Sequence, residues 1–134
     1  MAWSVDTSVL IDIFEGDPTF GMASALCLEA HAGEGLVVSP VVYIELSPVF
    51  EGDTQMQDLF LGEVGIAPML TWSSQDTLEA HRLWNEHVLK KRKKVTGKRP
   101  MADHLIAAFA KRFDGIITRN PKDFPDLPVI CPNL

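Results

Sequence analysis

The chain has 134 residues, of which 46% are hydrophobic and 22% charged, so we treat residues 1–134 as a single folded domain. This composition argues against disorder, the apolar runs are too short to cross a bilayer, and the N-terminal residues do not look like a secretion signal, so we expect a cytoplasmic protein with no membrane partner. The net charge of −6 argues at first against a nucleic-acid partner.

The sequence alternates short apolar segments, which predict β-strands, with longer segments whose apolar residues recur at helical spacing. In chain order we expect a strand over residues 2–5, helices over 9–14 and 22–32, a strand over 36–38, helices over 41–48 and 56–61, a short strand or edge segment over 66–70, helices over 75–91 and 100–110, and strands over 115–118 and 128–130. This alternation predicts an α/β fold whose parallel sheet is covered by helices on both faces.

Three isolated carboxylates stand next to apolar segments that are far apart in the sequence. Asp6 follows the first strand, at the edge where parallel sheets bind their ligands. Glu45 lies on an otherwise apolar helix face, where an unpaired charge is unfavourable by several kcal/mol. Asp103 lies in the first turn of the helix that begins at Pro100. Carboxylate oxygens are hard ligands, and such a set therefore suits Mg²⁺ or Mn²⁺.

Each of these carboxylates also has a purely structural explanation. Asp6 can cap the helix that follows it, and Asp103 can stabilise its own helix through the helix dipole. Glu45 can be half exposed at a helix edge. Three nearby hydroxyl groups either hydrogen-bond the carboxylates or a phosphate, or serve as caps and turn residues: Thr7, Ser8 and Thr118.

Seven of the twelve basic residues fall in one ten-residue stretch, which leaves a strongly acidic remainder. They are Lys90, Lys91, Arg92, Lys93, Lys94, Lys98 and Arg99. A local basic patch can contact phosphates whatever the total charge, because salt screens interactions beyond about 8 Å. The alternative is a solvated helix end and loop.

Four blocks of the sequence occur in a characteristic order, over residues 5–12, 39–46, 103–108 and 118–124. They read VDTSVLID, SPVVYIEL, DHLIAA and TRNPKDF. Together they resemble the PIN-domain nucleases and, within them, the VapC-type toxins of bacterial type II toxin–antitoxin pairs. The resemblance covers essentially the whole chain. It implies a three-layer α/β/α fold with a central, mostly parallel sheet of four or five short strands.

The resemblance also implies an Mg²⁺- or Mn²⁺-dependent endoribonuclease. Asp6, Glu45 and Asp103 match the acidic, metal-binding positions of the family. In the fourth block many relatives have Asp where this chain has Asn120, which can still donate a neutral oxygen or orient water. Asp123 can supply the missing charge, so we expect four catalytic residues, of which the first three hold the metal.

The expected reaction is hydrolysis of RNA by a metal-activated water, which leaves a 5′-phosphate and a 3′-hydroxyl. Lys98 and Arg99, just before the helix of Asp103, and Arg119 are the basic residues expected to contact RNA. The resemblance further implies a homodimer and a cognate antitoxin protein. Such an antitoxin would insert a peptide across the acidic site.

Two other functions fit the sequence. A non-catalytic RNA- or protein-binding module would have kept the fold and lost the metal, and Asn120 favours it. An aspartyl-phosphate phosphotransfer enzyme would also have its nucleophile directly after the first strand, as Asp6 is. The position two residues further on is Ser8 rather than the second Asp of the haloacid-dehalogenase pattern, which weakens this reading.

The histidines and cysteines lack the spacing of a metal site. We expect the four histidines to be exposed or capping residues: His31, His81, His87 and His104. We expect Cys27 and Cys131 to be small buried hydrophobic residues.

Overall fold

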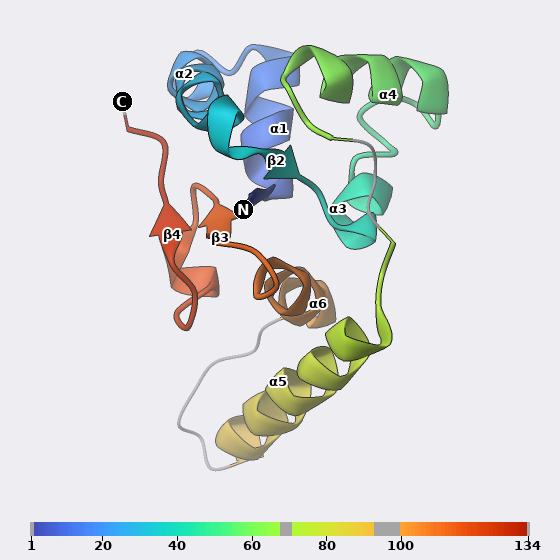
Figure 1. Cartoon of the computed structure of the whole chain (residues 1–134), viewed down its shortest axis with the longest axis vertical. Coiled ribbons are helices and arrows are strands. Elements are labelled where there is room, and N and C mark those ends of the chain that lie inside the picture. Colours follow the sequence, from blue (N-terminus) through green and yellow to red (C-terminus); the bar gives the residue numbers. More distant parts are fainter. Residues whose placement is uncertain (1, 68–70, 93–99, 134) are drawn as a thin grey trace.

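A four-stranded parallel sheet forms the centre of the fold (Figure 1). The structure is a computed structural model that describes residues 2–67, 71–92 and 100–133. The strands are β1 (Trp3–Val5), β2 (Leu36–Val37), β3 (Gly115–Ile117) and β4 (Val129–Ile130), in the spatial order β2-β1-β3-β4. All three strand pairs are parallel, with Trp3 opposite both Leu36 and Gly115. The predicted α/β fold with a parallel sheet is therefore confirmed.

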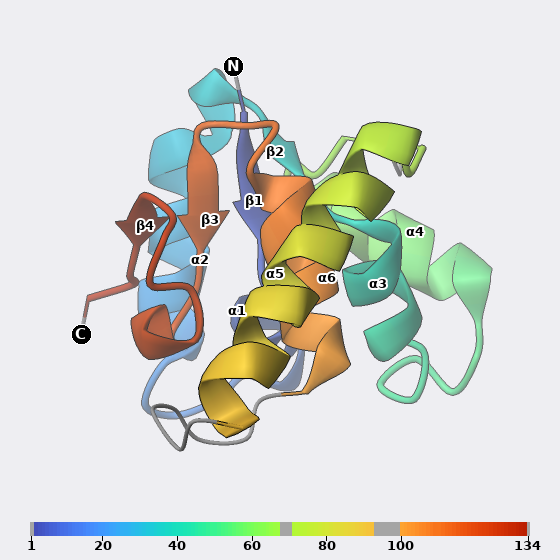
Figure 2. The same ribbon diagram turned by 90° about the horizontal axis from the view of Figure 1, so that it is seen from below.

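Helices cover both faces of this sheet. Figure 2 shows α5 and α6 in front of the strands and α2 behind them, and α6 contacts both β1 and β3. Within the described residues the helices are α1 (Thr7–Glu15), α2 (Gly21–His31), α3 (Pro40–Glu45), α4 (Thr54–Glu63), α5 (Ser74–Arg92) and α6 (Met101–Ala110), with short 3-10 helices η1 (Ala32–Glu34) and η2 (Pro121–Asp123). None of the described helices is long and apolar enough to cross a membrane.

Short-range hydrogen bonds fix where the helices begin and end. The Asp6 carboxylate caps α1 by accepting a hydrogen bond from the Thr7 amide. The Ser39 hydroxyl caps α3 in the same way, and Pro40 provides its first turn, as the sequence predicts. Helix α1 ends at Gly16, whose φ of 62° lies in the left-handed region that favours glycine.

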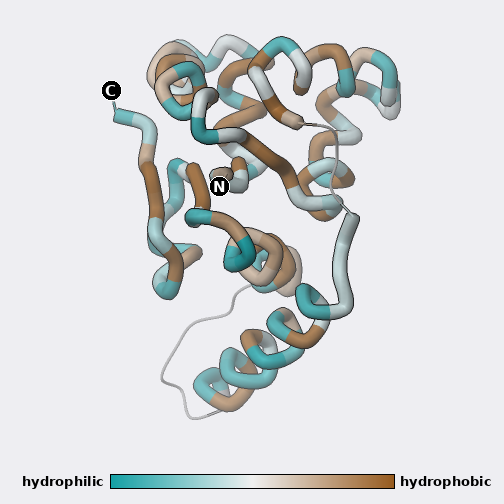
Figure 3. Tube along the Cα trace, viewed as in Figure 1, coloured by the Kyte–Doolittle hydropathy of each residue, from teal (hydrophilic) through white to brown (hydrophobic). Residues whose placement is uncertain are grey.

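The core lies between the sheet and the helices, and the strands stand out in Figure 3 as apolar segments. Val5, Ile116 and Ile117 of the two central strands are fully buried, as is Leu10 of α1. Apolar burial of this kind contributes about 25 cal/mol per Å². The strands are therefore anchored from both faces, which fixes the positions of the residues that follow them.

The strand order reverses between β1 and β3. From β1 the chain moves to one side to form β2, and it later returns to the other side to form β3. Ligands of open α/β sheets bind at such a reversal point. The residues that follow these two strands, Asp6 and Thr118, therefore border the expected binding crevice.

Several expected elements differ in extent from the observed ones, and two of the differences concern the segments between β2 and α5. The helix that begins at Pro40 ends at Glu45, before the predicted limit at Pro48. Of the segment expected over 66–70, Ile66 forms one parallel bridge with Leu36, and residues 68–70 lie outside the described part of the chain.

Candidate active site

Asp6 directly follows β1, and both of its carboxylate oxygens are hydrogen-bonded. Oδ1 accepts from the amide of Thr7 at 2.8 Å, and Oδ2 accepts from the hydroxyl of Thr118 at 2.7 Å. Asp6 is 8% exposed and Thr118 is fully buried. The second bond joins the residues that follow β1 and β3, and it therefore links the carboxyl ends of the two central strands.

The pKa of Asp6 is raised above its usual range, chiefly because burial disfavours the charged carboxylate. The hydrogen bonds from Thr118 and Thr7 act in the opposite direction and favour ionisation. The negative charges of Glu45 and Asp123 raise the pKa further. Acidic groups from three separate segments therefore act on one another electrostatically at this edge of the sheet, where a cation would relieve their repulsion.

Glu45 is the last residue of α3 and is exposed, so it does not occupy a buried apolar face. Its Oε1 accepts a hydrogen bond from the Thr7 hydroxyl at 2.7 Å. Thr7 thus contacts two carboxylates at once, Asp6 through its amide and Glu45 through its hydroxyl. One residue at the start of α1 therefore brings together two of the acids identified in the sequence.

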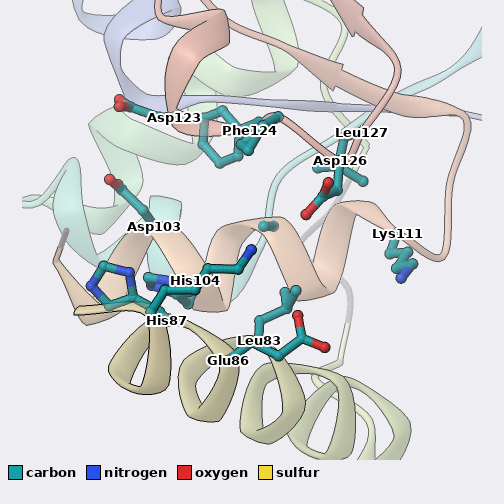
Figure 4. Close-up of a pocket in the computed structure, with 13 residues that line it drawn as sticks. Leu83, Glu86, His87, Asp103, His104, Lys111, Asp123, Phe124, Asp126 and Leu127 are labelled. Atoms are coloured by element: carbon teal, nitrogen blue, oxygen red, sulfur yellow. The ribbon is translucent and has the colours of Figure 1, made fainter. Parts of the chain in front are cut away.

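Asp103 and Asp123 come from two further segments of the chain and lie beside one cavity. Asp103 lies in the first turn of α6, Asp123 is the last residue of η2, and both are half-buried. Both line a cavity of about 120 Å³ beside α5 and α6, and Figure 4 shows their carboxylates at the same end of it.

The acidic side chains do not yet form a closed coordination shell. Among the described residues, no three His, Cys, Asp or Glu side chains are grouped so as to hold a metal ion. The structure brings Glu45 and Asp123 within electrostatic reach of Asp6, and it brings Asp103 and Asp123 to one cavity. Asp123 belongs to both groups, so it links Asp103 to Asp6 and Glu45 although the four acids do not meet at one point.

The supporting residues form a chain of hydrogen bonds around Thr118. Its hydroxyl accepts from the backbone amide of Asn120 at 3.0 Å and donates to Asp6. Asn120 itself is exposed. Ser8 behaves differently, because its buried hydroxyl has no hydrogen-bond partner within the described part of the chain. Lys98 and Arg99 lie outside the described residues.

Arg119 has a partner within the chain that sequence reasoning missed. Its Nε lies 2.5 Å from Oδ2 of Asp12, and its Nη2 donates to Oδ1 at 3.2 Å. The guanidinium also covers the ring of Phe20, 4.3 Å from its centroid. Asp12 is only 4% exposed, so Arg119 neutralises a buried carboxylate of α1 in this structure. The sequence does contain a sign of this ion pair, because Asp12 is an acid within the apolar run of residues 9–14 and a buried acid needs a partner.

The expectation for the histidines is wrong for two of the four. His87 and His104 are 8% and 6% exposed, because α5 packs on α6 and encloses both rings. The two ring centroids lie 4.8 Å apart, and Trp84 meets His104 edge to face. The cysteine expectation is also wrong, because Cys131 is exposed and Cys27 only half-buried.

Comparison with known proteins bears on the whole of this architecture. The sequence model of the PIN domain matches residues 4–129, a span that includes all four carboxylates. The chain belongs to the PIN domain family. No curated protein matches the sequence of this PIN domain.

Solved structures share the fold of this PIN domain. It is similar to a chain in the crystal structure of VapBC2 from Rickettsia felis bound to a DNA fragment from their promoter, with a TM-score of 0.72, 21% identity, and coverage of 99% of this chain and 100% of that chain. It is also similar to a chain of VapBC-1 from nontypeable Haemophilus influenzae, with a TM-score of 0.68, 20% identity and 98% coverage of both chains. At sequence identities of 20% and 21%, this similarity shows a shared fold.

Proposed function

We propose that this PIN domain is a metal-dependent endoribonuclease that acts in the cytoplasm as the toxin of a toxin–antitoxin pair. The supporting observation is the meeting of acids from distant segments where β1 and β3 end. Asp6 is the centre of this group, because its pKa is raised by burial and by the charges of Glu45 and Asp123. A site that gathers negative charge in this way favours a divalent cation.

The donor set fits Mg²⁺ or Mn²⁺, since its members are carboxylates with hard oxygen atoms. Asp6, Glu45 and Asp103 would hold the ion, and Asp123 would add charge beside it. When bound, the ion polarises the scissile phosphate, lowers the pKa of an attacking water and neutralises the leaving oxygen. Mg²⁺ keeps several of its waters, so a site with few protein ligands and no closed shell suits it.

The chain's own residues prepare the acids for this role. The Thr118 hydroxyl accepts from the Asn120 amide, so its proton is directed to Asp6, where it favours the ionised form. Thr7 holds Asp6 and Glu45 side by side. These bonds orient the carboxylate oxygens before substrate arrives. Mutation of residues that orient metal ligands in this way typically lowers metal affinity or activity about 10–100-fold.

The proposed substrate is RNA, and Lys98 and Arg99 are the proposed contacts to its backbone. The proposed partners are a cognate antitoxin and a second copy of this chain. The likeness to chains of VapBC2 and VapBC-1 supports the antitoxin. An antitoxin peptide that lays an Arg among the carboxylates would neutralise the same charge as the metal.

The test is cleavage of end-labelled RNA by the purified protein with Mg²⁺, Mn²⁺ or EDTA. We expect cleavage that requires the metal and yields 5′-phosphate and 3′-hydroxyl ends. Glu45→Gln and Asp103→Asn should abolish it. Glu15→Gln is the matched control for the first, because Glu15 is also an exposed residue at the last position of a helix. Cleavage in EDTA, or 2′,3′-cyclic phosphate ends, would refute the proposed chemistry.

The toxin role needs a separate test in growing bacteria. Induction of the wild-type chain should arrest growth, induction of Glu45→Gln should not, and co-expression of a small neighbouring gene should restore growth. Arrest by both versions would count against catalysis as its cause.

A non-catalytic RNA- or protein-binding module is the second candidate function. It is favoured by the lack of a three-residue metal group among the described residues and by Asn120 in place of an acid. Calorimetric titration with Mg²⁺ separates the two, since this module would neither bind the ion through Asp103 nor cleave RNA.

A further inference from the structure

A cavity of about 120 Å³ extends from the acidic site along the contact between α5 and α6. Its remaining wall is formed by residues 123–127, which are the last residue of η2 and the segment after it. We propose that this cavity binds one unpaired base of the RNA substrate, and that it favours a base with an exocyclic amino group. The inference rests on the proposed nuclease function and identifies the part of the RNA that the same site recognises.

The position of the cavity suits a base next to the cleaved bond. Asp103 and Asp123 line one end, so a base inside the cavity would have its backbone beside these carboxylates. Figure 4 shows Glu86 and Asp126 toward the other end, on opposite sides. The cavity therefore has an end suited to the reacting phosphate and an end suited to the edge of a base.

The sides of the cavity offer flat and apolar surfaces. His87 and His104 of α5 and α6 line one part, and Phe124 and Leu127 line the facing part. The two imidazoles are held by ring packing with Trp84, so they form a preorganised wall. Proteins recognise single-stranded RNA by placing unstacked bases against aromatic side chains of this kind.

The polar groups of the cavity select among bases. Carboxylates only accept hydrogen bonds when ionised. Glu86 already accepts from the Arg82 guanidinium through Oε1, so its Oε2 and the Asp126 carboxylate are the acceptors that favour a base edge with an amino group. Adenine, cytosine and guanine have such a group, whereas uracil presents an oxygen in its place. Lys90 also lines the cavity and can donate to the ring nitrogens or carbonyl oxygens of a base. Uridine is therefore the least favourable nucleotide at this position.

The test measures binding without cleavage, by fluorescence anisotropy of labelled hexaribonucleotides in EDTA. The probes are oligouridine and four versions with one central adenosine, cytidine, guanosine or abasic nucleotide. The acidic site repels all five backbones equally, so differences between them report on the base. We expect the best amino-bearing base to bind about tenfold more tightly than the abasic probe. Uridine should lie close to the abasic value.

Two variants locate the effect in the cavity. Ala107→Leu adds a larger side chain to the α6 wall and should remove the preference among bases. Ala30→Leu is its matched control, because Ala30 is exposed on α2 and should leave the preference intact. Asp126→Ala, in an exposed loop position that tolerates change, should reduce the discrimination against uridine without affecting folding. Thermal unfolding of each variant checks that it folds.

Equal affinity for all five probes, or a preference that survives Ala107→Leu in a folded protein, would overturn the inference. Cleavage assays with Mg²⁺ on the same probes separate this result from the proposed function. Metal-dependent cleavage with no base preference would refute the base site alone. A base preference without cleavage at any metal concentration would support the base site and refute the nuclease.

Discussion

Removal of the Thr118 hydroxyl tests the link between folding and the acidic site. In Thr118→Val the side chain keeps its shape, but Asp6 loses a buried donor 2.7 Å from its Oδ2. A hydrogen bond to a charged group contributes about 1.5–3 kcal/mol, so we expect a loss of about 2 kcal/mol at pH 7. For a domain of this size that corresponds to a melting temperature lower by roughly 6 °C.

The sign of the pH dependence follows from the raised pKa of Asp6. A raised pKa in the folded state means that ionised Asp6 opposes folding at neutral pH and that its contribution improves as the pH falls. Thr118→Val raises this pKa further. Its destabilising effect should therefore be smaller at an acidic pH than at pH 7, because only a neutral hydrogen bond is lost once Asp6 is protonated.

The assay is urea unfolding of wild type, Thr118→Val and Thr118→Ser at both pH values. Thr118→Ser keeps the hydroxyl and loses a methyl group, so it controls for packing. Equal destabilisation by Thr118→Val and Thr118→Ser at pH 7 would refute this role of the hydroxyl, and so would a loss in Thr118→Val that is the same at both pH values.

Three further perturbations give distinct outcomes. Saturating Mg²⁺ should stabilise the fold by about 2.7 kcal/mol at 100 times its dissociation constant. This gain should vanish in Asp103→Asn. It should also decrease as the pH falls through the raised pKa of Asp6, because protonated carboxylates do not bind metal. A wild-type melting temperature that Mg²⁺ leaves unchanged would contradict this prediction. Arg119→Ala leaves the buried carboxylate of Asp12 unpaired and should lower the unfolding free energy by about 3 kcal/mol. An unchanged unfolding free energy in urea would show that this ion pair does not stabilise the fold. Gly115→Ala places a Cβ 2.2 Å from a backbone oxygen at a φ of 150° and should destabilise by more than about 4 kcal/mol, whereas Gly33→Ala, with open space around it, should be neutral in thermal unfolding.

The sequence predicts the elements of this fold because their signals are local. The cap at Ser39 with Pro40 and the helix start at Pro100 each depend on neighbouring residues, and both are found where expected. The parallel sheet follows from the alternation of strands and helices. The strand order does not, because it depends on which face each crossover takes, and local periodicity contains no information on that choice.

The sequence identifies the candidate acids, but it does not identify the residues that hydrogen-bond or neutralise them. Asp6 could be placed at a strand end, but its bond with Thr118 joins residues 112 positions apart. Asp12 and Arg119 are similarly far apart, at 107 positions, and each residue alone has an ordinary explanation. The burial of His87 depends on how α5 packs on α6, which only the assembled tertiary structure determines.

Asp6 has two roles at once, because it caps α1 and is the central acid of the proposed site. A substitution there weakens the first turn of a helix, typically by about 1 kcal/mol, as well as removing a ligand. Loss of toxicity in an Asp6 variant would therefore have two causes that cannot be told apart, namely a lower amount of folded protein and the loss of a metal ligand. Glu45→Gln separates the two effects, since Glu45 is exposed at the end of α3 and begins no helix.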